Sequence, residues 1–406
     1  IAGATLDDMD TMVITGDTDV TMTKTQYAVF DGAMTATGDN QITISDNSAT
    51  LTGITSIEKY VLGNGTNSFT AAANVTNITG GSAGDTFVMA AGMVAGVTII
   101  GGGGDDTITL TNDTAVTDLD NISTVENIDI TATSASVYTL SASKALIAAG
   151  ATLDVDNLST NNMTLNIANN AGNGILDYTG NNGVDIITGS GGADVLKGGA
   201  GADQLNGGAG ADTITGGAAA DTIHFGDGDG AIDTYIMSSG MGSVSIIDDF
   251  EVGAGNDKFH LDLSEMNAIL DALTGGSTLR QLSNTDGEDA STATSLIVAS
   301  AGELTTSGIE ADIIQITGNR ADAAAAGALL ETGGANTITF TRAMTANDAF
   351  LMLWHDANHS YLSYVKTGVI DAGDAAGNTT FTEVNLLKFE GIAADQAFHT
   401  DNFTII

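Results

Sequence analysis

Apolar and polar residues alternate over many short stretches of the chain. In VTMT at 20–23, NQITIS at 40–45 and MTLNI at 163–167, every second residue is apolar, which is the period of a strand with one buried face. From residue 180 to residue 224 the pattern becomes a strict nine-residue period. The eighth place of each repeat is aliphatic, at Ile187, Leu196, Leu205, Ile214 and Ile223. The pattern predicts many short strands joined by tight turns, and therefore an all-β chain.

The nine-residue repeats combine glycine-rich turns with a regular series of carboxylates. They read GNNGVDIIT, GSGGADVLK, GGAGADQLN, GGAGADTIT and GGAAADTIH, and the sixth place is always aspartate, at Asp185, Asp194, Asp203, Asp212 and Asp221. Glycine allows the turn to visit positive φ and brings backbone carbonyls close together. If two repeats form one coil, equivalent aspartates stack at the inter-strand spacing of about 4.7–4.9 Å. Carboxylates this close repel and need a cation, and Ca²⁺, with its 6–8 oxygen ligands, fits best.

The composition supports a cation as the partner of these carboxylates. The chain of 406 residues has 51 acidic and 10 basic residues and a formal net charge of −41, which excludes nucleic acid and anionic membranes as natural partners. It has no cysteine and no proline, so disulfides and thiolate metal sites are excluded. No apolar run is long enough for a transmembrane segment. The first residues lack a signal peptide pattern, and we expect a processed or internal start.

Three other readings of the glycine-rich region fail on its pattern. A flexible linker would not keep the nine-residue phase or the inward aliphatic residues. A collagen-like rod needs glycine at every third residue together with proline. A phosphate-binding loop needs a GK[ST] motif or a helix start, and these aspartates would repel phosphate.

With these turns and aspartates, residues 180–224 resemble the RTX, or haemolysin-type, calcium-binding repeat family. The resemblance implies a right-handed parallel β-roll that binds several Ca²⁺ ions between its turns. It implies shared sites between Asp185 and Asp203, between Asp194 and Asp212, and between Asp203 and Asp221, with carbonyl ligands near Gly199, Gly201, Gly208 and Gly210. Asn182 and Ala219 depart from the family pattern. The terminal sites are therefore expected to be weaker or distorted.

The resemblance continues after the repeats, into FGDGDGAIDTY at 225–235 and IIDDFEVGAGNDKFHLDLS at 246–264. These stretches resemble the segment that caps RTX rolls, and a cap covers the open apolar end of a solenoid. Its pattern is carried by Ile247, Asp249, Phe250, Asp257, Lys258 and Phe259. The candidate metal ligands in this segment are Asp227, Asp229, Asp233 and Asp257.

Upstream of residue 180 the repeat is present in isolated copies. GGSAGDTFV at 80–88 and GGGGDDTIT at 101–109 place Asp85 and Asp106 at the sixth position. Each lacks a partner eighteen residues away, so a solenoid turn without tight metal and a calcium site both stay open. A longer repeat relates residues 20–35 to residues 138–153, read as strand, helical turns, glycine and strand, and relates SIEKYVL at 56–62 to TVENIDI at 124–130.

These patterns predict an all-β protein in three parts. Residues 1–179 form an irregular, threonine-rich β-solenoid, residues 180–262 form the calcium β-roll with its cap, and residues 263–406 form a β-rich domain with a few short helices. The last part contains helix candidates at 264–276 and 319–334 and a hairpin around DANHS. The end of the chain, HTDNFTII, resembles a type I secretion signal, and a final edge strand is the alternative reading.

The sequence gives little reason to expect an enzyme. His355 and His359 flank Asp356 and superficially resemble the HExxH zinc motif, but they lie in a predicted hairpin turn and lack the glutamate base. The sequence has no G-x-S-x-G nucleophile motif and no cysteine. We therefore expect no enzymatic activity and no catalytic residues.

Together these features predict a secreted structural protein that assembles with calcium into a cell-surface layer, sheath or filament. Similar threonine-rich segments occur in RTX surface-layer proteins of Gram-negative bacteria. The expected partners are copies of the same chain, in a lattice or filament, and a cell-surface polysaccharide. The expected location is the bacterial cell surface, reached by type I secretion. The alternative is the C-terminal RTX portion of an exported adhesin, toxin or hydrolase whose active region lies outside this chain.

Overall fold

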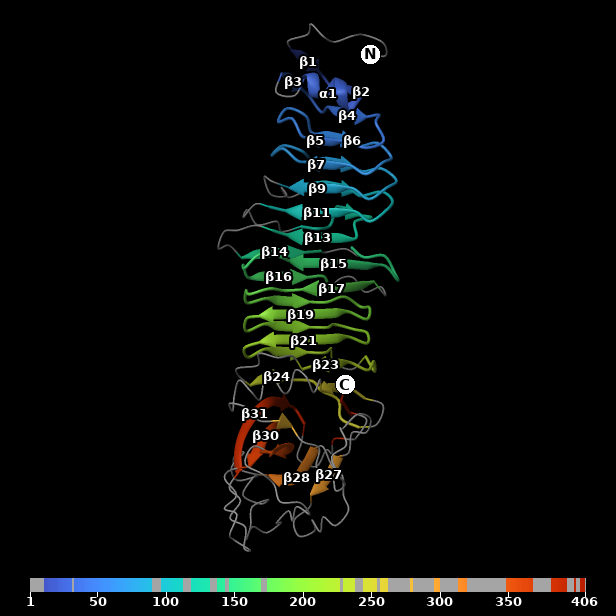
Figure 1. Ribbon diagram of the computed structural model, residues 1–406. Coiled ribbons are helices and arrows are strands. Elements are labelled where there is room, and N and C mark those ends of the chain that lie inside the picture. The colour runs from blue at the N-terminus through green and yellow to red at the C-terminus, as the bar shows by residue number, and fades with distance from the viewer. Residues whose placement is uncertain are drawn as a thin grey trace, which may run out of the picture. The chain divides into compact units, whose positions relative to one another are not determined.

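Short parallel strands are the main regular elements of the computed structural model (Figure 1). The chain divides into two compact units, Ile1–Val195 and Leu196–Ile406. The structure describes residues 11–30, 33–89, 96–111, 118–131, 137–142, 146–168, 174–226, 229–237, 244–253, 256–261, 278–279, 296–299, 313–319, 348–367, 381–392, 398 and 402–405. The all-β class predicted from the sequence is confirmed.

The first unit has two long parallel sheets, and the chain visits them in turn. We call one complete turn of the chain around the core a coil. One sheet is formed by β2 (Asp19–Met22), β4 (Gln41–Ile44), β6 (Lys59–Val61), β8 (Asn77–Thr79), β10 (Thr98–Ile100) and β12 (Ile122–Ser123). The other sheet consists, within this unit, of β5 (Thr50–Thr52), β7 (Ser68–Thr70), β9 (Thr86–Met89), β11 (Thr107–Leu110), β13 (Asn127–Ile130), β15 (Thr152–Asn157) and β17 (Ile175–Thr179).

A third group of strands in the first unit consists of β14 (Tyr138–Ser141), β16 (Met163–Asn166) and β18 (Ile186–Thr188). The N-terminal β1 (Met12–Thr15) pairs in parallel with β3 (Met34–Thr37). Parallel pairing throughout is the result of a solenoid, because each coil returns the chain to the same edge in the same direction. The parallel solenoid architecture predicted for this part of the chain is thus present.

The core of the first unit is a column of side chains that repeats from coil to coil. Leu51, Phe69, Phe87, Ile108 and Ile128 are cross-strand neighbours in successive strands, and none is more than 6% exposed. The residues on either side of each point outward, since alternate residues of a strand face opposite sides. The alternation noted in the sequence is therefore the alternation between core and solvent.

The longer repeat is confirmed in its first copy. Strand β2 is followed by helix α1 (Lys24–Phe30), which buries Tyr27 and Phe30, and then by β3. Thr23 and Gln26 form a capping box at the helix start, with N–H of Thr23 donating to Oε1 of Gln26 at 2.9 Å and N–H of Gln26 donating to Oγ1 of Thr23 at 3.2 Å.

The second copy of the longer repeat differs from the first. Strands β14 and β15 are present, but residues 146–150 form a bend and turn rather than a helix. The sequence ALIAAGA at 145–151 has no capping box before it, which removes one signal that starts a helix. The predicted helical turns are therefore wrong for the described part of this copy, and residues 143–145 lie outside the described residues.

In the second unit the strands again fall into two groups. One contains β19 (Val195–Ala200), β21 (Thr213–Ala218), β23 (Thr234–Ile236), β25 (Lys258–Leu261) and β32 (Phe403–Ile405). The other contains β20 (Gln204–Asn206), β22 (Thr222–His224) and β24 (Ser245–Ile247), continued by β31 (Phe381–Glu390), β30 (His359–Thr367), β29 (Asp348–His355), β28 (Ile313–Asn319) and β27 (Leu296–Ala299), while β26 (Thr278–Leu279) pairs with β29.

The predicted hairpin around DANHS is present, because β29 and β30 pair antiparallel with His355 opposite Ser360. Strands that follow the repeats by more than a hundred residues complete both groups: β31 pairs with β24, and β32 pairs with β25. The final residues thus contribute an edge strand, as one of the two readings expected. The predicted helices at 264–276 and 319–334 lie outside the described residues, except for Asn319, which ends β28.

A cluster of aromatic rings covers the end of the roll in the second unit. Phe250 lies 5.2 Å from Phe389 and 5.8 Å from Phe398 between ring centroids, and Phe259 lies 5.4 Å from Tyr235 and 6.2 Å from Phe403. All these rings are at most 5% exposed. Two phenylalanines of the predicted capping segment thus pack against strands from the end of the chain, as a cap requires.

The core column leads to a first test. Replacement of Phe87 by alanine removes a fully buried ring from the middle of the stack, so we expect unfolding free energy to fall by about 3–5 kcal/mol. The neighbouring Val88 faces outward, and Val88→Ala is the matched control, with a change within about 0.5 kcal/mol. Urea denaturation followed by circular dichroism measures both. Equal losses for the two variants would contradict the assignment of Phe87 to the core.

Candidate metal-binding turns

The sixth-position aspartates are buried side chains that face the inside of the turns. None of them is more than 4% exposed, in either unit, and the same holds for two aspartates of the capping segment, so that the buried set is Asp85, Asp106, Asp185, Asp194, Asp203, Asp212, Asp221, Asp233 and Asp257. They are held there because each aspartate directly precedes a strand whose second residue enters the core. Nine buried carboxylates within the described part of the chain are unusual, since burial without compensation disfavours the charged form.

Backbone N–H groups of the preceding coil supply part of that compensation. In the second unit the N–H of Asp203 donates to Oδ1 of Asp221 at 3.0 Å, and the N–H of Asp212 donates to Oδ1 of Asp233 at 2.7 Å. The N–H of Asp233 continues the series to Oδ1 of Asp257 at 3.1 Å. Equivalent aspartates of successive coils are therefore linked by a hydrogen bond from a backbone N–H to a carboxylate oxygen, and not by contact between two carboxylates.

The same contact occurs in the first unit. The N–H of Leu176 donates to Oδ1 of Asp194 at 2.6 Å, and the N–H of Met163 donates to Oδ1 of Asp185 at 2.7 Å. The phenol of Tyr178 donates to Oδ2 of Asp185 at 2.8 Å, while N–H and Oγ of Ser190 donate to Asp194 at 2.5 and 2.8 Å. These two carboxylates therefore receive hydrogen bonds from several neighbours.

The isolated copies upstream form a connected series, which corrects the expectation that each lacks a partner. The N–H of Asp85 donates to Oδ1 of Asp106 at 2.7 Å across a coil of 21 residues. The series extends to Asn67, whose N–H donates to Asp85, and to Glu126, whose carboxylate accepts from the N–H of Asp106 at 2.8 Å. The eighteen-residue rule failed here because this coil is three residues longer.

Glu126 and Glu58 explain the similarity between residues 56–62 and 124–130. Oε2 of Glu58 accepts a hydrogen bond from the N–H of Asn40 at 3.2 Å, as Oε2 of Glu126 does from Asp106. A glutamate just before a strand can thus replace the sixth-position aspartate. Neither glutamate was expected from its sequence position to take this role, although the shared motif was the signal that pointed to both.

Two of the aspartates have a second oxygen without a hydrogen-bond donor. Oδ2 of Asp106 and Oδ2 of Asp221 are buried, and neither has a hydrogen-bond partner among the residues that the structure describes. Burial raises the pKa of each of these carboxyl groups to about 6. A buried carboxylate oxygen with a free lone pair is the donor that a hard cation such as Ca²⁺ takes. The residues present therefore fit the calcium that the pattern predicts.

The first glycine of each repeat makes room for this oxygen. A Cβ added at Gly101 would collide with Oδ2 of Asp106, and one added at Gly216 would collide with Oδ2 of Asp221. The second glycine brings carbonyls to the same turn, since a Cβ at Gly217 would collide with the carbonyl oxygen of Gly199. Gly101, Gly216 and Gly217 therefore have no room for any residue larger than glycine.

The predicted carbonyl ligands lie in these turns. Gly199 and Gly208 have φ of +101° and +103°, and Gly210 has φ of +113°. The N–H of Gly201 donates to the carbonyl of Ala218 at 3.2 Å, and the N–H of Gly210 donates to Oδ2 of Asp229 at 2.5 Å. Asp229 is exposed. Asp227 lies outside the described residues.

The fourth position of the last repeat departs from the others, as the sequence indicated. Gly104 and Gly210 hold this position at positive φ, and Ala219 holds it at φ of +82°. An alanine in the left-handed region is strained by its Cβ, whereas glycine is not. The departure noted at Ala219 is therefore a strained turn next to Asp221.

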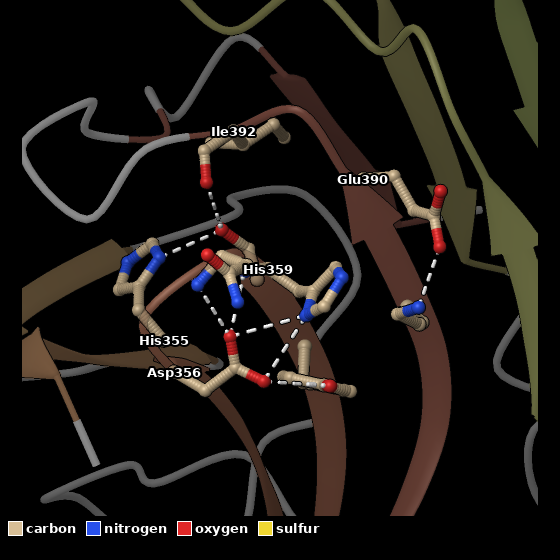
Figure 2. Close-up of polar contacts among 9 residues, drawn as sticks. His355, Asp356, His359, Glu390 and Ile392 are labelled. Carbon is tan, nitrogen blue, oxygen red and sulfur yellow. Dashed lines mark hydrogen bonds and ion pairs between the residues drawn. The ribbon is translucent and has the colours of Figure 1, made fainter.

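The histidine pair is part of a hairpin turn (Figure 2). The side chain of Asp356 accepts hydrogen bonds from the N–H groups of Asn358 and His359, both at 2.7 Å, and from the phenol of Tyr361 at 3.0 Å. Burial opposes ionisation of Asp356, but these hydrogen bonds outweigh it and lower the pKa to about 2. His355 is 1% exposed, with Nδ1 2.7 Å from Oγ of Ser360. The arrangement stabilises the turn.

Comparison with known proteins agrees with the turn geometry. The model of the RTX calcium-binding nonapeptide repeat matches residues 97–114, 179–214 and 200–232, which supports the RTX family. Repeats of this kind bind Ca²⁺ and are typical of exported proteins. No curated protein and no solved structure matches the chain. Over the described residues, no helix has the length and apolarity to span a membrane.

Relief of strain at Ala219 gives a second test. Because glycine adopts positive φ without strain, we expect Ala219→Gly to raise the unfolding free energy by about 1 kcal/mol. Ala209 lies in the preceding turn without positive φ, and Ala209→Gly is the control, expected to lower stability by about 0.5–1 kcal/mol. Urea denaturation in EGTA measures both. A loss of stability in Ala219→Gly would contradict the strain.

The raised pKa values give a third test. Burial raises the pKa of Asp106, Asp221 and Asp257 from 3.8 to about 6 and that of Asp233 to about 7. Between pH 4 and 7 the folded chain thus binds more protons than the unfolded chain, so the stability that these groups contribute in EGTA is lost as the pH rises through this window.

Calcium binding has the opposite dependence on pH, since the ion must displace these protons. We expect the dissociation constant for Ca²⁺ to be at least about tenfold larger at pH 5.5 than at pH 7.5, and we expect binding to release protons. Isothermal titration calorimetry in buffers of different ionisation enthalpy measures both quantities. Binding that does not change between these pH values would show that the buried carboxylates are not the ligands.

Proposed function

We propose that the protein is a secreted, calcium-binding structural protein that assembles with itself into a cell-surface layer, sheath or filament. The observation that supports this proposal most is that the first unit is a stack of coils. The inward side chains of successive coils fill a continuous core there. Such a stack offers repetitive outer faces, which suit lateral contact between copies. The proposal includes no catalytic role.

The charge of the chain explains why assembly would depend on calcium. At a net charge of −41, copies of the chain repel one another. Calcium held in the turns removes part of this charge and stabilises the turns that contain Asp221 and Asp106. Sodium screens the charge, with a Debye length of about 8 Å at 0.15 M, but it does not provide a multidentate link.

One face of the first unit is suited to contact with a second copy. The outward residues of β5, β7, β9 and β11 form two columns in register, and we call them the threonine face: Thr50, Thr52, Ser68, Thr70, Thr86, Val88, Thr107 and Thr109. None of these eight side chains carries a charge. Within a strongly acidic chain, an uncharged and regular face is where two copies approach with the least repulsion.

The assembly leads to a fourth test. We expect the purified chain to form large particles or ordered arrays in millimolar Ca²⁺, to disperse in EGTA, and to stay dispersed in sodium chloride of matched ionic strength. Light scattering and electron microscopy measure this directly. A monodisperse monomer in all three solutions would reject the assembly and favour an exported protein whose active region lies elsewhere.

A pair of double variants tests the face itself. Thr70→Glu with Thr109→Glu adds two charges to the threonine face, and we expect this variant to bind calcium but not to assemble. Thr43→Glu with Thr79→Glu adds the same charge, two coils apart, on the other sheet of the unit. This control is expected to assemble as the original chain does. Equal assembly of the two variants would exclude the threonine face as the contact.

A further inference from the structure

The last nine-residue repeat ends in a histidine, unlike the repeats before it. In chain order the ninth position holds Thr188, Lys197, Asn206, Thr215 and His224. Ile223 is fully buried, and alternate residues of a strand point to opposite sides, so the side chain of His224 faces outward from β22. The repeat thus places an imidazole on the outer face of the roll.

The capping segment brings two carboxylates to this imidazole. Strands β22 and β24 pair in parallel with Ile223 opposite Ile247, and the N–H of Asp248 donates to the carbonyl of Ile223 at 3.2 Å. Asp248 therefore lies next to His224 on the outward face. The chain bends where β24 ends, and the bend lets the next residue, Asp249, turn to the same nitrogen.

The three side chains converge on one point. Nδ1 of His224 lies 2.7 Å from Oδ1 of Asp248 and 3.2 Å from Oδ2 of Asp249, and one ligand atom of each residue lies within 4.8 Å of the other two. The ligand atoms of a tetrahedral Zn²⁺ ion, with bonds of about 2.0–2.2 Å, are about 3.3 Å apart. Among the residues that the structure describes, no other group of three histidine, cysteine or acidic side chains converges within this distance.

A hydrogen bond alone does not account for two carboxylates at one nitrogen. Nδ1 carries at most one proton, and the shorter distance assigns that proton to Asp248. Even a protonated imidazole leaves the group of three with a net negative charge. A divalent cation in place of the proton would neutralise both carboxylates and keep the nitrogen bound.

Backbone groups hold one of the carboxylates in place. Asp249 accepts hydrogen bonds from the N–H groups of Phe225 at 2.9 Å and Gly226 at 2.8 Å, one on each oxygen, and its side chain is 5% exposed. Such hydrogen bonds orient a ligating carboxylate and strengthen metal binding. Each oxygen keeps a second lone pair for a metal. The side chains of His224 and Asp248 are partly exposed, which gives access to the ion and to a water as fourth ligand.

We propose that His224, Asp248 and Asp249 bind one Zn²⁺ ion. The site goes beyond the proposed function, because Ca²⁺ takes oxygen ligands, whereas an imidazole nitrogen with two carboxylates suits Zn²⁺. Binding replaces the proton of Nδ1 and releases it to the solvent. The ion links the last repeat to the capping segment, next to Phe250 of the aromatic cluster, and so stabilises the contact between cap and roll.

Zinc titration of the full chain by calorimetry, in millimolar Ca²⁺, tests the site. Because Ca²⁺ at this concentration competes for sites made of carboxylates alone, we expect one Zn²⁺ ion per chain to bind. His224→Gln removes the ligating nitrogen. We expect it to weaken this binding at least about hundredfold, since loss of a partner that only orients a ligand already costs about 10–100-fold. Asp248→Asn is expected to weaken it at least about tenfold.

His260→Gln is the matched control. His260 lies on β25 in the same unit, is half-buried and does not belong to the group of three. We expect this variant to bind one Zn²⁺ ion with the affinity of the original chain. Circular dichroism shows whether each variant is folded. If His224→Gln is not, Asp248→Asn decides, because Asp248 is exposed.

The link to the cap has its own readout. Because an ion that binds only the folded chain stabilises it, we expect Zn²⁺ to raise the thermal unfolding midpoint of the original chain and of His260→Gln, but not that of His224→Gln. A midpoint of the original chain that does not change with Zn²⁺ would contradict the link.

The outcomes separate this site from the calcium-binding function. Absence of zinc binding by the original chain in Ca²⁺ would reject the site and leave calcium binding unaffected. Equal zinc affinity of the original chain and of folded His224→Gln would show that zinc binds elsewhere. A loss in His260→Gln equal to that in His224→Gln would reject the assignment to these three residues.

Discussion

The burial of carboxylates in the turns is the constraint on which the rest of the structure depends. A buried aspartate is tolerated only if hydrogen bonds or a cation stabilise its charge. Here the preceding coil supplies an N–H to one oxygen, as from Asp203 to Asp221, and this contact requires that successive coils stay in register. The glycine five residues earlier is required because a Cβ there would collide with the second oxygen. Register, turn composition and the fit of a cation to the turns thus have one cause.

The sequence was sufficient for the parts of the fold that repeat with a strict period. The inward residues Ile187, Leu205 and Ile223 are fully or almost fully buried, because a three-residue strand offers only one side chain to the core. The link between Asp85 and Asp106 was missed because coil length changes from 18 to 21 residues, and spacing alone does not show which turns lie above each other. Asn67 and Glu126 were missed because they occupy the place of the sixth-position aspartate in this series but are not aspartates.

The sequence also could not show what closes the roll. A final edge strand was one reading of the last residues, but a strand pattern carries no information about its partner, because every parallel edge offers the same backbone groups. Only the structure places β31 against β24 and β32 against β25. A small cavity in the second unit is lined by Asp229, Asp233 and Asp257, which the sequence analysis named as candidate ligands, and by Asp249 and Glu251, whose loops follow no fixed period.

These strand pairings also have a consequence for the order of folding. In the first unit a coil meets the previous one after about twenty residues, and contacts of such short sequence separation form quickly. In the second unit Asn402 donates a hydrogen bond to the carbonyl of Asp257 across 145 residues of chain, and closing so large a loop has a much higher entropic barrier. Coils of the first unit can therefore form one after another, whereas completion of the cap is the slow, cooperative step. Until it is complete, the edges of β24 and β25 stay open to the strands of other chains.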